Sequence, residues 1–514
     1  MRIHELLELV VPALGDRLLV SDADGSLTAT GLGAGAARAG RWLAGRGDAH
    51  VLLLDTNSRA VPLALFGASR AGLPFTPLNY RLTDDRLAAL LRRSVPAVAI
   101  VGDGVRERIG EIDGVTTVSR TDFLEAVEHG DAVDGTAGDA SDVAVMLFTS
   151  GTTGEPKAAV LQHHHLSSYV LNTVEFAAAE PQEAALVSVP PYHVAGIAAV
   201  LSSAFAGRRI VYLDAFEPEL WVSTAIAEAV THAMVVPTML GQILDELERR
   251  GSTAPDLRAL SYGGGPMPLA VIERALEMLP HVAFVNAYGL TETASTVAIL
   301  GPDDHREAIA SDDPVVRRRL GSVGRPLPAV ELTIRDAEGA EVAPGQRGEV
   351  WVRGAQVSGR YQTGAARPDS GRDGDDVTGD DGREDADWLR TRDAGEVDEA
   401  GFVYLHGRLD DIIVRGGENL SPGEIESVLM EHDAIEACAV VGIPDVRWGQ
   451  RVVAVAVVRS GAVVDEAELQ SLVRDRLRST RTPERIQFRS DLPVSETGKL
   501  LRRVLRDELT ALFG

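Results

Sequence analysis

Cysteine and lysine are almost absent from this sequence of 514 residues. The single cysteine, Cys438, excludes a disulfide framework, and its apolar surroundings in EACAVVGI favour a buried, unreactive thiol. Lysine occurs only at Lys157 and Lys499, although the chain holds 50 basic residues. Apolar runs long enough to span a membrane are also missing. The N-terminus, with Glu5 and Glu8 among its apolar residues, is typical of an amphipathic surface helix and not of a secretion signal, so we expect a cytoplasmic protein.

Positive charge is scarce as well. Acidic residues number 76 against 50 basic ones, and the formal net charge is −26. Nucleic-acid-binding proteins neutralise phosphates with clustered Lys and Arg, so this balance argues against a nucleic-acid partner. Apolar residues make up 45% of the chain, which is enough for a sizeable core. At this length we expect a large body with one or more smaller domains.

The pattern of apolar runs predicts an α/β body. Short runs rich in Val, Ile and Leu alternate with helical stretches, which is typical of buried, mostly parallel strands. They lie at 51–55, 98–101, 143–148, 209–214 and 233–237. From about residue 320 the strands are shorter and the turns tighter, which predicts a small β unit. Segment 363–387 is rich in Asp and Gly and is predicted to be a disordered surface loop.

The last hundred residues have a different pattern of predicted strands and helices. Strand-like runs at 437–443 and 452–458 and a charged helix around 465–478 predict a compact α+β domain of usual size. We place its boundary near Asp410, giving domains at 1–409 and 411–514. Histidines 163–165 are consecutive and would point in different directions on a helix, so we expect a loop leading into a helix and no metal site.

A glycine- and hydroxyl-rich loop follows the run at 143–148. Its sequence, TSGTTGEPKAAV, spans 149–160. Glycines allow tight turns that aim N–H groups inward, hydroxyls add donors, and Lys157 adds a compact charge, so the loop suits a polyphosphate. The lysine lies beyond a Glu-Pro pair, so this is not the G-x-x-x-x-G-K-[ST] loop. A polar turn after a strand is the alternative.

Five segments, in this order, resemble the signature motifs of the adenylate-forming superfamily. The superfamily includes acyl- and aryl-CoA synthetases, the adenylation domains of peptide synthetases and firefly luciferase. The segments are TSGTTGEPK (149–157), SYGGGPMP (261–268), NAYGLTET (286–293), TRDAGEVDEAGFVYLHGRLDD (391–411) and PVSETGKLLRR (493–503). The resemblance covers roughly residues 20–505. It implies a large α/β body with a small β-barrel and a small, mobile α+β C-terminal domain.

The resemblance also implies a role for each motif. The ring of Tyr288 would stack on adenine, and Glu292, with Thr152, would hold Mg²⁺ while Thr291 lies near the α-phosphate. Asp393 and Arg408 would contact the ribose. Further nucleotide contacts would come from Thr149, Ser150, Gly151, Thr153, Gly154, Gly263, Gly264, Gly265, Pro266, Asn286, Ala287 and Gly289. His193, Gly265 and Ser295 would line the acid pocket, with His193 gating or lining it and not acting as a general base.

The C-terminal domain carries the second lysine. By resemblance, this domain swings about a hinge at Asp410 and brings Lys499 over the acid and the α-phosphate, where its charge stabilises the transition state of adenylation. In the other orientation Gly416 and Gly417 would flank a pantetheine tunnel, and Arg447 would meet the CoA nucleotide. The family commonly has Thr-Gly-Asp where this chain has Thr-Arg-Asp, and we expect Arg392 to point outward.

The placement of the lysines is a separate argument for catalysis. If lysine and arginine were interchangeable, both lysines would fall on these two motif positions with a chance of about one in a thousand. Lys157 is expected to bind the leaving phosphates from a fixed loop, and Lys499 to act chiefly in adenylation.

The leading hypothesis is an ATP-dependent acid:CoA ligase that uses Mg²⁺ and CoA and forms an acyl-AMP without a protein nucleophile. One alternative transfers the acyl group to a carrier-protein thiol, an amine or another acceptor, and includes nitrite-activating, diazotase-like chemistry. Another is a catalytically silent nucleotide-binding protein. The identity of the acid and the oligomeric state stay open.

Overall fold

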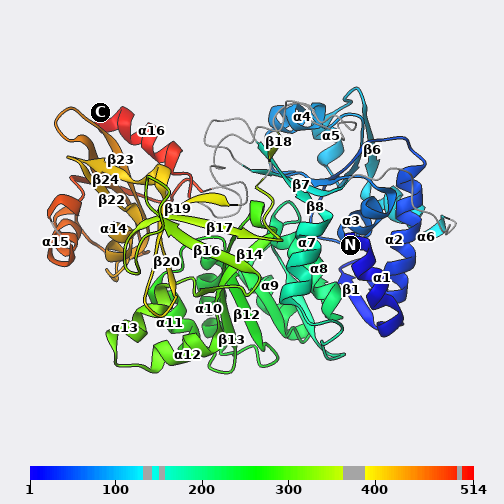
Figure 1. Ribbon diagram of the computed structural model, residues 1–514, viewed down its shortest axis with the longest axis horizontal. Helices are drawn as coiled ribbons and strands as arrows, with labels where there is room; N and C mark the ends of the chain where they lie inside the picture. The colour runs from blue at the N-terminus through cyan, green and yellow to red at the C-terminus, as the bar shows by residue number, and fades with distance from the viewer. Residues whose placement is uncertain are drawn as a thin grey trace.

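The structure is a computed structural model that describes residues 1–130, 142–149, 157–359, 361–362, 388–477, 479–494 and 500–513. Four sheets with flanking helices make up this part of the chain, and the C-terminal domain lies at the end of the molecule opposite to α2 and α6 (Figure 1). Ser150 to Gly154, Lys499 and the acidic segment 363–387 lie outside the described residues. Within the described ranges, no helix is both long and apolar enough to cross a membrane.

The first sheet confirms the predicted parallel strands. Every residue of β3 and β5 is buried, and the two strands pair in parallel, with Val51 opposite Val98. In sheet order the strands are β18 (Tyr361–Gln362), β8 (Lys157–Gln162), β7 (Val143–Thr149), β4 (Phe75–Pro77), β3 (His50–Leu54), β5 (Ala97–Val101) and β6 (Val115–Ser119). The helices of this region are α2 (Ala29–Ala44), α3 (Ala60–Ala71), α4 (Asp84–Arg92), α5 (Val105–Ile109) and α6 (Arg120–His129).

The second sheet is the larger one, with parallel pairing from β1 through β10, β9, β11 and β12 to β13. In sheet order its strands are β15 (Arg325–Pro326), β14 (Ser295–Leu300), β13 (Ala283–Leu290), β12 (Ala259–Gly263), β11 (His232–Val235), β9 (Ala184–Val187), β10 (Arg209–Tyr212), β1 (Leu18–Asp22) and β2 (Gly25–Thr28). The helices of this region are α7 (His163–Thr173), α8 (Val194–Ala206), α9 (Pro218–Ala227), α10 (Pro237–Arg250), α11 (Leu269–Met278), α12 (Pro302–Ala310) and α13 (Pro314–Arg317). Histidines 163–165 form the first turn of α7, so the loop expected there was wrong.

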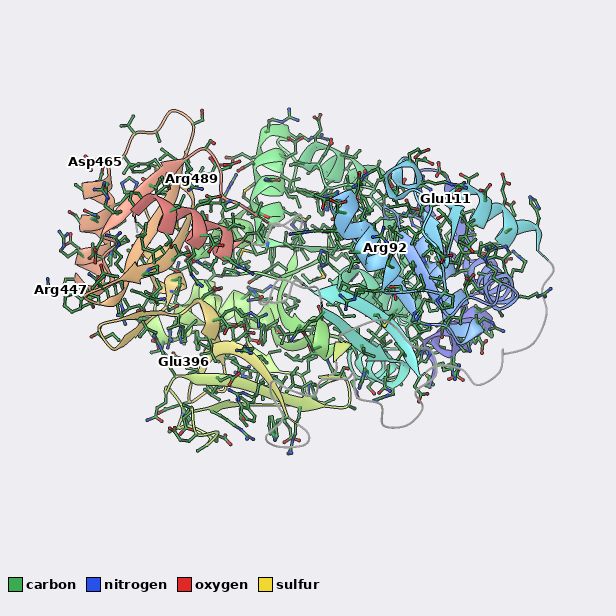
Figure 2. The ribbon with its side chains drawn as sticks, turned by 90° about the horizontal axis from the view of Figure 1, so that it is seen from above. Arg92, Glu111, Glu396, Arg447, Asp465 and Arg489 are labelled. Atoms are coloured by element: carbon green, nitrogen blue, oxygen red, sulfur yellow. The ribbon has the colours of Figure 1, made fainter. Side chains whose placement is uncertain are left out.

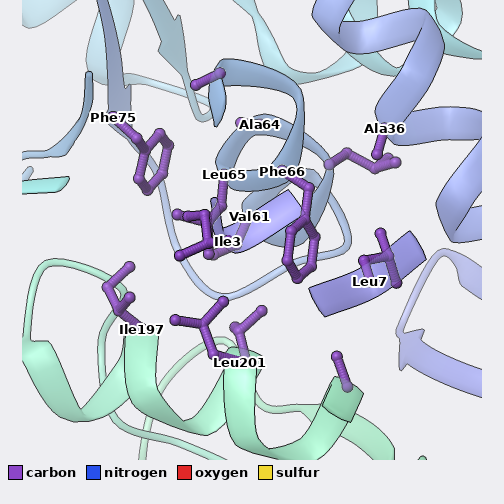
Figure 3. Packing of buried hydrophobic residues seen from close by; sticks show 14 of the residues in the cluster. Ile3, Leu7, Ala36, Val61, Ala64, Leu65, Phe66, Phe75, Ile197 and Leu201 are labelled. Carbon is purple, nitrogen blue, oxygen red and sulfur yellow. The ribbon is translucent and has the colours of Figure 1, made fainter. Parts of the chain in front are cut away.

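The N-terminal helix α1 (Ile3–Leu14) joins the two halves of the body. Ile3 and Leu7 lie between α3 and α8, where they pack into the same buried cluster as Phe66 and Leu201 (Figure 3). Leu9, on the other face, is 48% exposed. The helix is therefore amphipathic, as predicted, and its apolar face completes the core between the sheets.

The third sheet is antiparallel and carries part of the candidate site. Its strands are β16 (Val330–Arg335), β17 (Gly348–Gly354), β19 (Leu389–Val397) and β20 (Val403–Arg408), in that order. Ile334, Val350 and Val352 pack on its inner face beside Val297 of β14. Among the described residues this is an open four-stranded sheet, and closure into a barrel stays a prediction.

The C-terminal domain is a separate α+β unit, as predicted. It follows the short helix η3 (Leu409–Asp411) and consists of β21 (Ile413–Arg415), β22 (Glu418–Leu420), α14 (Pro422–Leu429), β23 (Ile435–Asp445), β24 (Gly449–Val458), α15 (Glu466–Arg476), β25 (Arg485–Arg489) and α16 (Arg502–Phe513). Cys438 lies on β23, and burial raises the pKa of its thiol, as expected for an unreactive cysteine.

Candidate functional site

The motif residues gather where the parallel strands of the second sheet end. The carboxyl ends of parallel strands meet at one edge of a sheet, and ligands of open α/β sheets bind outside that edge. Here β9 leads toward His193, β12 into Gly263 to Pro266, and β13 into Thr291 and Glu292. Segments that are a hundred residues apart in sequence therefore share one edge of the sheet.

Glycine is required at the end of β12. A Cβ atom at Gly263 would lie 2.3 Å from the carbonyl oxygen of Ala287 on β13, which is too close for any other residue. Gly264 has a φ of +80°, in the left-handed region, and a Cβ atom at Gly265 would meet nothing closer than Pro237, at 4.0 Å. The main chain at this edge thus carries no side chains, and this is where the resemblance implies that adenine and the acid bind.

Tyr288, Asp393 and Arg408 form one bonded chain. The Tyr288 hydroxyl donates to Asp393 Oδ2 over 2.6 Å, and Arg408 Nε lies 3.0 Å from Asp393 Oδ1. Arg408 also donates to the carbonyl oxygen of Thr391, over 2.7 Å. Burial, and next the negative charge of Asp393, raise the pKa of Tyr288 well above its usual value, so the phenol remains a donor. Asp393 and Arg408 lie directly opposite each other on β19 and β20.

The chain reverses sharply at the predicted magnesium ligand. Glu292 lies in η1 (Thr291–Thr293), half buried, between β13 and β14. The two residues after η1, Ala294 and Ser295, have φ angles of 53° and 109°. A Cβ atom at Gly289 would lie 1.9 Å from the Ser295 carbonyl oxygen. Left-handed backbone at non-glycine residues is uncommon and concentrates at functional sites, where the surroundings must hold it in place.

Two residues that sequence reasoning missed hold this turn. Gln356 Nε2 donates to the carbonyl oxygens of Thr293 and Thr296, over 3.0 and 2.7 Å. The backbone N–H of Ser358 donates to the Glu292 carbonyl oxygen over 2.8 Å, and the Ser358 hydroxyl donates to the carbonyl oxygen of Val160 on β8. Both side chains are buried, at 1% and 4% exposure. The two residues stand in the segment AQVSG, which follows an apolar strand. The one signal in this segment is that its two polar residues occupy alternate positions.

Ser358 thereby connects the turn of Glu292 to the strand that Lys157 begins. Lys157 is the first residue of β8 and lies opposite Thr149 at the end of β7. The residues between them belong to the predicted phosphate loop outside the described ranges. The two ends of that loop are therefore fixed by antiparallel pairing, and the lysine end is bonded to the carboxylate turn through one serine.

His193 lies at the start of α8, as predicted for the loop PYHVAG. Its ring centroid is 4.8 Å from that of Tyr192, and its Nε2 atom is buried without a hydrogen-bond partner among the described residues. Burial lowers the pKa of His193 to about 4, so the imidazole is neutral at neutral pH. Helix α8 packs on β14, which starts at Ser295. A neutral ring at the start of this helix suits a pocket wall.

The glycines of the C-terminal domain form a two-residue hairpin turn. Gly416 and Gly417 connect β21 and β22 with φ angles of 58° and 84°, and two consecutive positive values are what a type I′ turn needs. The Gly416 N–H donates to the Trp448 carbonyl oxygen over 2.8 Å, and the guanidinium of Arg447 lies 4.8 Å from the Trp448 ring centroid. Gly416, Gly417 and Arg447, which the sequence assigned to the CoA side, therefore lie close together in the structure.

Other predicted contacts have partners within the body. Asn286 donates through Nδ2 to the carbonyl oxygen of Ser322, over 2.9 Å, and Ala287 lies against Gly263. Arg392 points away from the sheet edge toward Asp410, with Nη2 3.2 Å from Oδ1. Its side chain is 50% exposed, which agrees with the expectation that it points outward.

A family model described as AMP-binding enzyme matches residues 10–362, and the model of the AMP-binding enzyme C-terminal domain matches residues 424–499. The chain belongs to the AMP-binding enzyme family. The resemblance to adenylate-forming enzymes is thereby confirmed, and with it the fold class of a large α/β body and a separate C-terminal domain.

Relatives within the AMP-binding enzyme family differ in their acceptors. Feruloyl-CoA synthase of an Amycolatopsis species is 32% identical over 93% of this chain and 91% of the relative. The fatty acid–[acyl-carrier-protein] ligase ScoC of Streptomyces coeruleorubidus is also 32% identical, over 86% of this chain and 83% of the relative. The solved structure of ATP-bound MatB from Rhodopseudomonas palustris superposes with a TM-score of 0.84 at 26% identity, covering 100% of both chains.

Proposed function

We propose that this protein is an ATP-dependent acid:CoA ligase that forms an acyl-AMP and then a thioester. The single observation that carries the proposal is the bonded chain of Tyr288, Asp393 and Arg408, because it joins two motifs that are a hundred residues apart into one polar cluster at the strand edge. In the first half-reaction, the acid carboxylate attacks the α-phosphorus of ATP and the bond to pyrophosphate breaks. In the second, the CoA thiol attacks the acyl carbonyl and AMP leaves.

The residues of the body contribute positioning and charge. The bare backbone of Gly263 to Gly265 can approach a flat base closely, and Asp393 and Arg408 offer an acceptor and donors for sugar hydroxyls. Lys157 would bind the phosphates of the leaving pyrophosphate. Phosphoryl chemistry of this kind relies on charge stabilisation in a positioned complex, so no protein nucleophile is needed.

The residues present fit Mg²⁺. In the described part of the chain, no three His, Cys, Asp or Glu side chains gather into a metal cage. A single carboxylate such as Glu292, with the predicted Thr152 hydroxyl, is what Mg²⁺ uses when its other ligands are water and substrate phosphates. When bound there, the ion would neutralise phosphate charge.

The hinge and the location belong to the same proposal. We infer domains at 1–409 and 411–514 that meet at Asp410, with Lys499 serving adenylation in one orientation and the Gly416–Gly417 turn serving thioester formation in the other. A cytoplasmic location is supported by the single, half-buried free cysteine, since a reducing compartment suits a free thiol.

A carrier-protein thiol is the second candidate for the acceptor. It is favoured by the similarity to an acyl-carrier-protein ligase, whose sequence identity of 32% equals that of feruloyl-CoA synthase. The reactive thiol belongs to phosphopantetheine in both cases, and it would reach the same site as part of CoA or attached to a carrier protein. The exposed Arg447 and Trp448 beside the glycine turn favour CoA, whose nucleotide they could contact by charge and stacking.

Pyrophosphate release from MgATP, measured with a panel of aryl and alkyl acids, tests the activity. Parallel reactions with CoA, with a phosphopantetheinylated carrier protein, with an amine and with no acceptor identify the product by mass. We expect acid-dependent pyrophosphate release and a CoA thioester. ATP that neither binds nor turns over with any acid would overturn the enzyme assignment. Lys499→Ala should abolish adenylation, with Arg503→Ala, four residues further along the chain, as the matched control for loss of one positive charge.

A further inference from the structure

Arg392 has a backbone conformation that side chains rarely adopt. Its φ is 61°, where glycine is the usual residue. The conformation is held from the body of the protein, because the Arg392 N–H donates to Glu349 Oε1 over 3.1 Å. Glu349 is only 5% exposed and is itself fixed by Arg390, whose Nη2 lies 2.8 Å from Oε2. An arginine at such a position needs a reason beyond the turn itself.

The side chain of Arg392 leads to the connection between body and C-terminal domain. Its Nη2 lies 3.2 Å from Oδ1 of Asp410, which is the middle residue of η3. The preceding ion pair, between Asp393 and Arg408, belongs to the same pair of strands. Residues 392 and 393 of β19 therefore bind residues 410 and 408, and the chain remains attached to the body as far as Asp410.

The next residue, Asp411, is attached to the other side. Its carboxylate lies 3.5 Å from Arg502 Nε and 3.7 Å from Arg506 Nη2, both on α16 of the C-terminal domain. Arg502 is fixed in turn by Glu426 of α14, over 2.8 Å. Two consecutive aspartates thus point to different bodies, and the change of attachment falls between them.

Within the described residues, few other hydrogen bonds or ion pairs connect the body to the C-terminal domain. In the described part of the two bodies they include the Ser421 hydroxyl, which donates to the carbonyl oxygen of His406, and Arg347, 4.0 Å from Glu424. The C-terminal domain can therefore turn relative to the body by breaking these contacts and rotating the backbone at residues 410 and 411.

We propose that Arg392 is a positioning residue for this hinge, and that its ion pair with Asp410 stabilises the present orientation of the C-terminal domain against the alternative one. Arg392 then sets the balance between the two half-reactions without touching either substrate. This inference rests on the proposed two-step function. A half-exposed ion pair is worth little in a rigid protein. When it holds the hinge residue Asp410 in its present backbone conformation, however, the same energy shifts the equilibrium between conformations by about 1.5- to 5-fold.

A double-mutant cycle of Arg392→Gly and Asp410→Asn tests the proposal. Glycine suits the left-handed backbone, and asparagine keeps the shape of aspartate without its charge. Adenylation is measured by isotope exchange between pyrophosphate and ATP, and thioester formation by a single turnover of preformed acyl-AMP. We expect each single variant to change the ratio of the two rates by about 1.5- to 5-fold in the same direction, and the double variant to change it no further.

Domain orientation can be followed directly by energy transfer between two dyes. Cysteines introduced at Glu111 and at Val463 place the dyes far apart, because Glu111 and Asp465, two residues after Val463, lie toward opposite ends of the molecule (Figure 2). Both positions are exposed, Val463 by 93%, and burial raises the pKa of the native Cys438 thiol, which slows its labelling. Arg392→Gly should shift the distribution of transfer efficiency, whereas Arg353→Gln, which removes an arginine paired with Glu331 on the same sheet, should not.

Each outcome is decisive. A rate ratio and a transfer distribution that are unchanged in both single variants would overturn the proposal, as would effects that multiply in the double variant. A change in the KM for ATP together with a lower melting temperature would assign Arg392 a merely structural role. If the wild type catalyses neither half-reaction, the proposed function fails, and the energy-transfer experiment still tests the hinge.

Discussion

Replacing Gln356 with leucine tests whether the turn of Glu292 must be held in place. Leucine fills a similar buried volume but removes both donors to the Thr293 and Thr296 carbonyl oxygens. Each lost hydrogen bond costs about 1 kcal/mol, and the buried carbonyls are left without these donors. The loss is partly offset because Gln356 Oε1 is itself buried with no partner within the described residues. We therefore expect a destabilisation of about 1–2 kcal/mol.

Part of that energy should appear in the reaction. A looser η1 turn positions Glu292 less well, and 1.4 kcal/mol at the transition state is a factor of about ten, so adenylation should slow by about three- to ten-fold. The Mg²⁺ concentration needed for half-maximal rate should rise, and thioester formation from preformed acyl-AMP should stay unchanged. Stability is measured by chemical unfolding, and adenylation by pyrophosphate exchange across a Mg²⁺ series.

Gln470→Leu is the matched control. Gln470 Nε2 also donates to two carbonyl oxygens, those of Pro483 at 3.0 Å and Glu484 at 3.3 Å, but it lies in the C-terminal domain on α15. It should lose similar stability and keep its adenylation rate. If Gln356→Leu behaves in the same way, the reasoning that connects the buried amide to Glu292 is refuted, and Gln356 supports the fold only.

Three further changes have outcomes that follow from the geometry. Tyr288→Phe removes a hydrogen bond to the charged Asp393 and should cost about 1.5–3 kcal/mol of stability while weakening ATP binding, as measured by unfolding and calorimetric titration. Trp448→Ala should raise the KM for CoA and leave pyrophosphate exchange unchanged, since its ring packs beside Gly416 on the acceptor side. His50 is 5% exposed and burial lowers its pKa to about 4, below the unfolded value of about 6.5, so stability is lost as pH falls through this window. His50→Leu should therefore stabilise the protein more at about pH 5 than at about pH 7.5, by up to about 2 kcal/mol in denaturant unfolding curves, and an equal gain at both pH values would contradict the assignment.

The elements of the body could be predicted because local pattern determines them. A short apolar run such as 51–55 between helical stretches indicates a strand that is covered on both faces, and β3 is that strand. Which sheet a strand joins is a different matter. The hairpin of β1 and β2, first in the chain, pairs with β10 of the second sheet, and β18 pairs with β8 of the first. These partners are chosen by long-range packing, which leaves no periodic signal in the sequence.

The residues of the candidate site could be predicted where the type of residue itself indicates a chemical role. Tyr288, Asp393 and Arg408 were named from their motifs, but their direct bonding was not foreseen, because it depends on how β13 lies against the third sheet. Gln356 and Ser358 had no such motif. An amide and a hydroxyl are common surface residues, and only their burial, with their donors directed at the carbonyls around Glu292, distinguishes them.

Arg392 shows how a departure from a motif can be interpreted once backbone and partners are known. In sequence it is only extra bulk and charge beside a nucleotide site. In the structure its left-handed backbone costs about 1 kcal/mol relative to glycine, and a half-exposed pair with Asp410 returns about 0.2–1 kcal/mol. Glycine would lose more entropy on folding, so the substitution Arg392→Gly should be close to neutral for stability. A residue that contributes so little to the folded state, yet binds the last residue attached to the body before the hinge, has its effect on the position of the C-terminal domain.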